Sequence, residues 1–319
     1  MAALRFAFPA GGMLSQRCMR ILFVTSNRVG DAILSTGLLD HLIRAHPQVR
    51  ITVVCGPAAE GVFARMPNHE RTIVLEKRPY GRHWLRLWTE VFFQRWDLVV
   101  DIRGTAISWL VPTRGRAVWR RRAGHKIAEN AAVLRLDPPP LPVVWTAPAD
   151  QARAAAMLPA RRTLIALGPT ANWAPKTWPA ARFAELFQAL AAGPLLGAVP
   201  IVFAGPGAME AAMAAPLLAA LPDAIDLSGR LSLPEVAACL QRCALYIGND
   251  SGLMHLAAAT GIPTLGLFGP TSAAEYAPAG RRAAAVLSAD GTMKGLTVAT
   301  ALGAAIQLVG QVASHPSPA

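Results

Sequence analysis

The sequence predicts an α/β protein built from two doubly wound, Rossmann-like domains that face a cleft. Short apolar segments alternate with helix-like segments in the first half of the chain, and the same alternation restarts in the second half. A proline-rich stretch at residues 138–148 separates the halves, as a stiff linker does. A length of 319 residues agrees, since single cores rarely exceed about 250–300 residues. We predict domains at 19–150 and 151–319, after an extension at 1–18.

Each half contains four segments that are typical of buried strands. Because parallel strands end at the same edge of a sheet, the two domains are expected to present these edges to a shared cleft. The predicted strands are residues 20–25, 51–55, 72–75 and 97–102, then 163–167, 200–204, 244–247 and 264–268. The predicted helices are residues 30–46 and 82–94, then 179–192, 208–220, 233–242 and 251–260.

Composition argues against a membrane-spanning or disulfide-stabilised protein. The long uncharged stretches at 186–209 and 251–274 are interrupted by Pro and Gly, which favours helix, turn and buried strand over a transmembrane helix. The N-terminus lacks a signal-peptide layout, and Met19 is an alternative start. Four scattered cysteines indicate a reduced, cytoplasmic compartment. We expect Cys239 and Cys243 to pack in the core rather than bind metal.

Positive charge is concentrated in one segment. The formal net charge is +12, and residues 65–126 hold 14 Lys or Arg against 5 Asp or Glu, or +9. Five of the eight tryptophans lie there too. This mixture suits an anionic membrane surface, a phosphorylated glycolipid or a nucleic acid, and the alternative is an Arg-rich solvated surface above core tryptophans. We predict weak peripheral membrane attachment through residues 84–96, and no recognition motif supports nucleic-acid binding.

The most informative stretch is YIGNDSGLMHLAAATGIPTLGLFGPT at residues 246–271. Asp250, Ser251 and Gly252 lie where a strand becomes a helix, and the unpaired N–H groups and dipole of a helix start bind phosphate well. The stretch therefore predicts a binding site for the phosphates of a nucleotide. His255 lies on the same helical face as Ser251, although a lone histidine is more often structural.

Asp31 follows the first predicted strand, within SNRVGD. It is either a first-turn acid that favours the helix dipole or a general base for a substrate hydroxyl. The segment has neither the G-x-G-x-x-G nor the G-x-x-x-x-G-K-[ST] spacing, which argues against a dinucleotide or P-loop site.

Two further loops in the second half offer ligand-binding side chains. Thr170 and Lys176 lie in GPTANWAPKTWP and can both reach an anionic ligand, with Lys176 suited to a diphosphate. Glu210, near a helix start, either hydrogen-bonds ribose hydroxyls or favours the helix dipole. Taken alone, Lys176 is equally well read as a solvated loop lysine.

Together, SNRVGDAILST, GPTANWAPKTWP and GNDSGLMHLAAATGIPTLGLFGPT resemble glycosyltransferase family 9, the heptosyltransferases of lipopolysaccharide core assembly. The resemblance spans residues 20–309 and implies a GT-B fold with an N-terminal acceptor domain, a C-terminal nucleotide-sugar domain and a last helix able to cross back. It places the catalytic Asp at Asp31 and the donor-binding residues at Thr170, Lys176, Glu210, Asp250, Ser251, Gly252 and His255.

The implied reaction is a single inverting displacement from a nucleotide-sugar donor, ADP-heptose in the first instance, to a lipid-linked glycan at the cytosolic membrane face. The chain has no D-x-D pair, so we expect no metal and no cofactor. Our candidate acceptor-binding residues are Arg28, Arg103, Arg120 and Arg122. The alternatives are a non-catalytic nucleotide-sugar binder, a family member using another donor sugar, and, on charge alone, a nucleic-acid binder.

Overall fold

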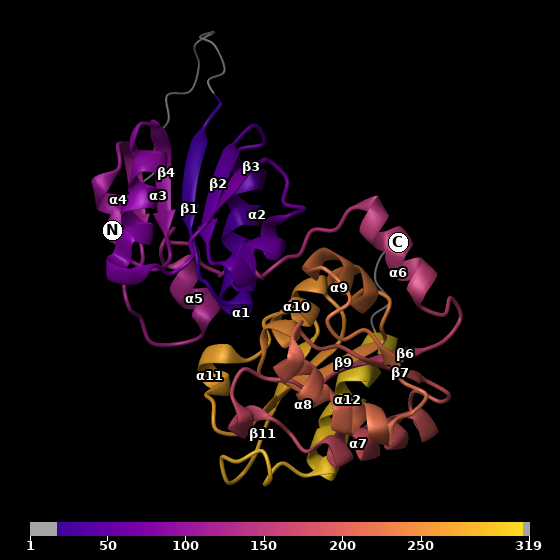
Figure 1. The fold of residues 1–319 in the computed structure, drawn as a ribbon. Helices are drawn as coiled ribbons and strands as arrows, with labels where there is room; N and C mark the ends of the chain where they lie inside the picture. Colours follow the sequence, from indigo (N-terminus) through magenta and orange to yellow (C-terminus); the bar gives the residue numbers. More distant parts are fainter. Residues whose placement is uncertain (1–17, 315–319) are drawn as a thin grey trace.

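The computed structural model describes residues 18–314, so the extension at residues 1–17 lies outside the described residues. The first domain is a five-stranded parallel sheet in the order β3-β2-β1-β4-β5 (Figure 1). Its strands are β1 (Arg20–Val24), β2 (Arg50–Cys55), β3 (His69–Val74), β4 (Trp96–Asp101) and β5 (Thr113–Val118). Its helices are α1 (Val29–Ile33), α2 (Thr36–Ala45), α3 (Arg82–Phe92), α4 (Ile107–Leu110) and α5 (Lys126–Ala131), with short 3-10 turns at Pro57–Phe63 and Pro79–Gly81.

The second domain is a six-stranded parallel sheet in the order β11-β10-β9-β6-β7-β8. Its strands are β6 (Leu164–Gly168), β7 (Val199–Val202), β8 (Ile225–Asp226), β9 (Leu245–Asn249), β10 (Thr264–Phe268) and β11 (Ala283–Leu287). Its helices are α7 (Ala180–Ala192), α8 (Ala208–Ala220), α9 (Leu233–Leu240), α10 (Gly252–Thr260), α11 (Ala273–Tyr276) and α12 (Val298–Ser314), with a 3-10 turn, η3, at Ala174–Lys176. The prediction of two doubly wound parallel sheets is confirmed.

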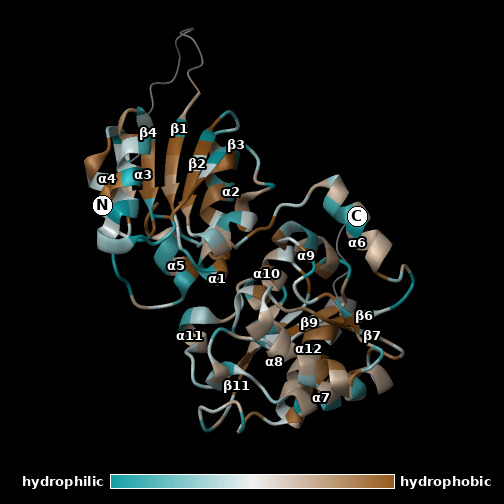
Figure 2. Ribbon diagram, in the orientation of Figure 1, coloured by the Kyte–Doolittle hydropathy of each residue, from teal (hydrophilic) through white to brown (hydrophobic). Residues whose placement is uncertain are grey.

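The two domains are joined by a continuous apolar core. Buried side chains of β1 and β2 belong to the same cluster as those of α9 and α10, and α1 packs directly on α10. The strands at the centre of each domain are the most apolar segments, whereas α5 on the cleft side is polar (Figure 2). A connecting helix, α6 (Pro148–Met157), packs on α9, and its Asp150 accepts two hydrogen bonds from Arg65 of the first domain. The predicted boundary at residue 150 therefore falls inside a helix that contacts both domains.

The structure differs from the predicted elements in several places, and helices α4, α5, α6 and α11 were not predicted. The helix expected at 30–46 is two helices, since buried hydroxyls at the junction bond to backbone carbonyls: Ser35 to Ala32 and Thr36 to Ile33. Strands β5, β8 and β11 were not predicted, because edge strands are half exposed or short and lack a buried apolar run. The last described helix, α12, packs on α7, β10 and β11 and does not cross back within the described residues.

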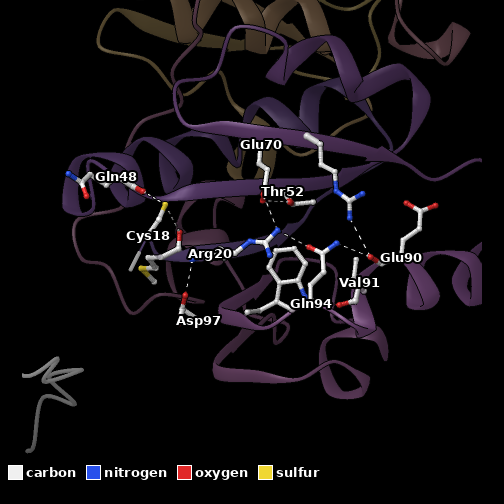
Figure 3. Close-up of polar contacts among 12 residues, drawn as sticks. Cys18, Arg20, Gln48, Thr52, Glu70, Glu90, Val91, Gln94 and Asp97 are labelled. Carbon is white, nitrogen blue, oxygen red and sulfur yellow. Dashed lines mark hydrogen bonds and ion pairs between the residues drawn. The ribbon is translucent and has the colours of Figure 1, made fainter. Parts of the chain in front are cut away.

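A polar cluster lies at the amino ends of the strands of the first sheet, away from the cleft (Figure 3). The Arg20 guanidinium donates to Glu70 Oε1 and Gln94 Oε1, both at 2.9 Å, and the Arg20 amide donates to Asp97 Oδ2 at 2.9 Å. Thr52 also donates to Glu70, at 3.1 Å. These contacts tie β1, β2, β3 and β4 together at their amino ends, so we interpret the cluster as structural.

The two uncharged stretches fold as predicted into helix, turn and strand, within α7 and β7 and within α10 and β10. Across residues 18–314, no helix is both long and apolar enough to span a membrane. Cys239 and Cys243 are buried free thiols, in agreement with a packing role. The same described part of the chain contains no group of three or more His, Cys, Asp or Glu side chains arranged to hold a metal.

Candidate active site between the two sheets

Two glycines allow the helices that follow β1 and β9 to meet closely. A Cβ added to Gly30 of α1 would lie 2.9 Å from Cδ2 of His255, and one added to Gly252 of α10 would lie 3.1 Å from Cβ of Val29. Any larger residue would push the two helices apart. This contact places α1, the helix that contains Asp31, beside α10 (Figure 1).

Asp31 is half-buried and faces the second domain. Its Oδ2 accepts a hydrogen bond from the Ser26 hydroxyl at 3.3 Å. Tyr276 of α11 lies close enough for an electrostatic effect: burial raises the pKa of the Tyr276 phenol, and the charge of Asp31 raises it further. A carboxylate held by one hydroxyl and turned toward the opposite domain is suited to accept a proton from a hydroxyl bound between the domains.

Lys176 forms an ion pair at the start of α10. Its Nζ donates to Asp250 Oδ2 at 2.6 Å, and both side chains are largely withdrawn from solvent. Because Asp250 directly precedes Ser251, the N-terminal cap of α10, the ammonium lies next to the positive end of the helix dipole. This combination of a lysine and a helix N-terminus favours an anionic ligand.

A buried asparagine that sequence reasoning missed holds the lysine-bearing loop. Asn249 donates from Nδ2 to the Pro169 carbonyl at 2.7 Å, and its Oδ1 accepts from the Trp178 amide at 3.1 Å. These two bonds clamp both ends of the loop that carries Thr170 and Lys176. The only sequence signal is an amide at the end of a buried strand, where it has backbone groups within reach.

The first turn of α10 holds buried polar atoms without a hydrogen-bond partner among the described residues. Ser251 occupies the cap position, but its side chain does not cap the helix. The His255 ring is buried in the same turn, and burial lowers its pKa to about 4 despite the opposing charge of Asp250, so the ring is neutral at neutral pH. His255 Nδ1 is buried with no hydrogen-bond partner among the described residues.

The remaining predicted donor-side residues lie along the same edge of the second sheet. Thr170 is buried in the loop that follows β6. Glu210 lies in the first turn of α8, after β7, where its Oε2 accepts from the Gly205 amide at 3.0 Å. The structure therefore brings the predicted donor residues to one edge, and their individual roles stay predictions.

Where the acceptor is predicted to bind, a pocket of about 400 Å³ opens between α5 and α11. Lys126 forms an ion pair with Glu129. Burial acts to raise the pKa of Glu129, but hydrogen bonds from Lys126 and from the Arg122 amide hold it below its usual value. His125, at the cap of α5, hydrogen-bonds through Nε2 with the Ala277 carbonyl at 2.9 Å. The lining residues are Trp119, Arg121, Arg122, Ala123, Gly124, Lys126, Glu129, Glu275 and Tyr276.

The four predicted acceptor arginines all follow strands of the first sheet but occupy different places. Arg122 lines the interdomain pocket, and Arg120 and Arg122 line a groove of about 780 Å³ beside β5. Arg103 donates to Asn27 Oδ1 at 3.2 Å and stacks over Trp84. Arg28 is exposed before α1. Sequence reasoning missed Lys126 and Tyr276, because no local signal shows that α5 and α11 meet.

The sequence profile of glycosyltransferase family 9 (heptosyltransferase) matches residues 111–305. The chain belongs to glycosyltransferase family 9. The resemblance inferred from the three motifs is thereby confirmed, and the protein is a glycosyltransferase.

Relatives of this family 9 enzyme include a curated protein of Haemophilus influenzae, lipooligosaccharide heptosyltransferase 2. It is 26% identical over 306 residues, which cover 82% of this chain and 86% of the relative. Lipopolysaccharide heptosyltransferase 1 of Pseudomonas aeruginosa is 28% identical over 288 residues, with 80% and 79% covered. The solved Escherichia coli ADP-heptose lipopolysaccharide heptosyltransferase II matches with a TM-score of 0.73 and 22% identity, over 92% of this chain and 99% of that one. The predicted GT-B fold is thus confirmed.

Proposed function

We propose that this enzyme transfers a heptose, or a related sugar, from a nucleotide diphosphate donor to a glycan of the lipopolysaccharide core. The supporting observation is one arrangement: α1, which carries the Asp31 carboxylate, packs on α10, and Lys176 pairs with Asp250 at the start of α10, which suits a diphosphate. The names of the relatives support heptose and lipopolysaccharide as the substrate classes. ADP-heptose is the donor we favour, since a similar Escherichia coli heptosyltransferase was solved with ADP.

The proposed reaction is a single displacement with inversion at the anomeric carbon. Asp31 accepts the proton of an acceptor hydroxyl as its oxygen bonds to the anomeric carbon. The bond from that carbon to the diphosphate breaks, and the leaving nucleoside diphosphate takes the electron pair. Lys176 and the first-turn amides of α10 stabilise the charge that develops on it.

We also propose that catalysis needs no metal and no cofactor. A divalent ion in such transfers neutralises the leaving diphosphate, and here an ammonium and a helix N-terminus already supply positive charge at one point. The absence of a D-x-D pair from the sequence agrees. The test is turnover after exhaustive chelation with EDTA. An unchanged rate is expected, and a loss restored by Mg²⁺ or Mn²⁺ would reject metal independence.

The experiment that tests the function itself is transfer from a panel of ADP-, UDP- and GDP-sugars to a truncated core glycan. A thermal-shift screen selects the donor first, because a bound ligand raises the melting temperature by mass action. Transfer with inverted anomeric configuration, seen by NMR of the product, is the expected result. Binding of a donor without transfer to any acceptor, or hydrolysis, would instead favour the non-catalytic binder.

We further propose that the enzyme works in the cytoplasm, attached weakly to the membrane surface that carries its lipid-linked acceptor. Exposed apolar side chains gather on and beside α3 and α4: Tyr80, Leu85, Phe93, Trp109 and Leu110. Arginines at 78, 82 and 86 accompany them, which suits anionic lipid. Trp96, part of the predicted contact segment, is instead 1% exposed and belongs to the core.

Sedimentation with phosphatidylglycerol vesicles tests this attachment. The double variant Leu85→Ser with Trp109→Ser is expected to lower the bound fraction several-fold, because both side chains leave the apolar patch. Leu196→Ser, at an exposed position of the second domain, is the matched control and is expected to bind as the wild type does. Equal sedimentation of all three proteins would reject the patch as the contact.

A further inference from the structure

A groove of about 780 Å³, called the β5 groove below, runs along the edge strand of the first sheet. Its lining residues come from both ends of that strand: Arg114 lies at the amino end, and Trp119 and Arg122 follow the carboxyl end. The six residues of β5 span about 20 Å at about 3.3 Å per residue, so the groove suits an extended ligand.

The β5 groove exists because the topology leaves part of the first sheet uncovered. Helices normally cover both faces of a parallel sheet. In the first domain β5 is followed by α5, a helix of six residues at the cleft end of the sheet, and the chain then crosses to the second domain (Figure 1). Leu98 of β4 and Ala117 of β5 pack on the core that α2 shares, yet both stay partly exposed and line the groove. The groove therefore has an apolar floor.

Positive charge surrounds this floor. The lining includes five arginines and one acidic residue, Asp97, which pairs with Arg114 at 3.4 Å. All five arginines are exposed. The four that form no ion pair within residues 18–314 are Arg116, Arg120, Arg122 and Arg135. Like charges gathered without carboxylates attract an anion, so the groove is complementary to a lipid that carries anionic groups.

Arg135 has a backbone conformation that favours glycine. Its φ is 58°, in the left-handed region. The Arg135 amide donates to the Ala132 carbonyl at 3.2 Å, and the Leu136 amide donates to the Ala131 carbonyl at 3.0 Å. This is the pattern of a helix C-terminus at which glycine is the usual residue. The turn itself therefore does not call for an arginine, whereas a groove that binds an anion does.

The β5 groove connects two regions that the proposed function already uses. Trp119 and Arg122 line both the groove and the pocket between α5 and α11. Trp109, in the helix that precedes β5, lines the groove and also belongs to the exposed apolar patch on and beside α3 and α4. A ligand lying in the groove therefore extends from the proposed membrane contact to the interface between the domains.

We propose that the β5 groove binds the phosphorylated lipid end of the acceptor, while the sugar end of the same molecule enters the pocket between α5 and α11. The inference rests on the proposed function, which makes the acceptor a lipid-linked glycan. The phosphates pair with the arginines, and the apolar part beside them covers Leu98 and Ala117. The enzyme thereby selects a lipid-linked glycan over a free one.

The segment at residues 1–17 is an alternative occupant, because it precedes Met19, which lines the groove. That segment contains two arginines, Arg5 and Arg17, and no acidic residue. Its charge has the same sign as that of the groove, so charge complementarity favours the phosphorylated lipid.

The test measures binding of three forms of one acceptor to the full chain by calorimetry. The forms are heptose-free lipopolysaccharide in a nonionic detergent, the same material without its acyl chains, and the same material without its phosphates. We expect the intact form to bind about 10-fold more tightly than either of the others, because each treatment removes one of the two features that the groove recognises.

Arg135→Gly removes one guanidinium at a position where glycine is unstrained. The melting temperature should stay the same or rise, because glycine adopts a left-handed conformation without a Cβ clash. Binding of the intact form should weaken about 3- to 10-fold, and binding of the phosphate-free form by less than about 1.5-fold, because the arginine acts on the phosphates. Arg161→Gln, at an exposed position of the second domain, is the control and should change neither.

Three results would overturn the inference. The first is equal binding of the intact and acyl-free forms, or an equal effect of Arg135→Gly on the phosphorylated and phosphate-free forms. The second is an equal effect of Arg135→Gly on phosphatidylglycerol in the same detergent, which would mean that the groove takes any anionic lipid. The third is tighter binding of the intact form after deletion of residues 1–17, which would identify that segment as the occupant.

Turnover separates this inference from the proposed function. Sugar transfer to the acceptor combined with any of the three results above rejects the inference alone. Binding with the expected pattern, but without transfer from any donor, rejects the proposed function alone. If the protein neither binds nor modifies any form of the acceptor, both are rejected.

Discussion

The carboxyl edges of the two sheets differ in how firmly their polar side chains are held. On the second sheet, Lys176 is paired with Asp250, Asn249 clamps the loop between them, and Tyr246 fills a slot made by glycines. On the first sheet, Arg28, Arg120 and Arg122 are exposed, whereas Arg103 is half-buried and bonded to Asn27, and Asp31 is half-buried in the domain contact.

This difference fits the substrates that we propose for each edge. A small diphosphate needs donors fixed in advance, because electrostatic stabilisation of a leaving group is largest when nothing must reorganise. The proposed glycan acceptor is compatible with flexible arginines, which lose side-chain freedom only when the ligand is bound. We therefore expect substitutions on the second sheet to change binding and turnover sharply, and single arginine substitutions on the first sheet to change them modestly.

The largest effect is expected for Asp31→Asn, the proposed general base on the first domain. Turnover should fall about 10²- to 10⁴-fold, because the amide cannot accept the acceptor's proton. Nucleotide affinity, measured by calorimetry, should stay within about 2-fold, since the donor site lies on the other domain. Retained turnover would remove Asp31 as the base, and Asp40→Asn, in the middle of α2, serves as the control.

The next effect is expected for Lys176→Met on the donor side. Loss of the ammonium should lower turnover about 10²-fold, because one donor to the leaving group disappears. It also leaves the Asp250 carboxylate buried and unpaired, so the melting temperature should fall.

Adding Asp250→Asn to Lys176→Met separates these two effects. Stability should return, because the buried charge is gone, while turnover stays low. Lys294→Met, at an exposed position, is the matched control. Recovery of turnover in the double variant would show that Lys176 only neutralises Asp250.

A smaller effect on turnover is expected for a change at the contact between α1 and α10. Gly30→Ala places a Cβ 2.9 Å from the His255 ring, so α1 and α10 must separate slightly. Turnover should fall about 10-fold, because catalytic geometry tolerates little displacement, while nucleotide affinity is kept. Gly303→Ala, in α12 with open space around it, should leave turnover unchanged and raise stability by up to about 1 kcal/mol. Equal turnover of the two variants would mean that the close contact between α1 and α10 does not matter for catalysis.

The smallest effect is a change in stability with pH. Burial lowers the pKa of His255 from 6.5 to about 4, with Asp250, His125 and Lys176 as the charged or titratable groups near it. The unfolded chain therefore binds more protons between pH 6.5 and 4, and folding free energy is lost as the pH falls through this window. His255→Gln should flatten the profile by about 2 kcal/mol, measured by urea unfolding at pH 7.5 and 4.5. An equal pH dependence of the free energy of unfolding in the wild type and in His255→Gln would contradict a buried neutral ring.

Strand and helix positions in the second domain were largely predictable. The helix predicted at 208–220 and the strand predicted at 264–268 have those bounds in the structure, since long helical runs and short apolar runs are set by local sequence. Other elements in both domains escaped prediction. The α1–α2 break depends on buried hydroxyls at Ser35 and Thr36, and edge strand β5 alternates arginine with small residues.

The sequence by itself determined the family, the two-sheet architecture and the placement of Asp250, Ser251, Gly252 and His255 at a helix start, because these depend on residue order and short-range periodicity. Only the tertiary structure decided that Lys176 pairs with Asp250, 74 positions away, that Tyr276 faces Asp31, and that Tyr246 reaches the donor edge. Those relations depend on how the two sheets and the domain contact pack, and packing brings together residues that no local pattern connects.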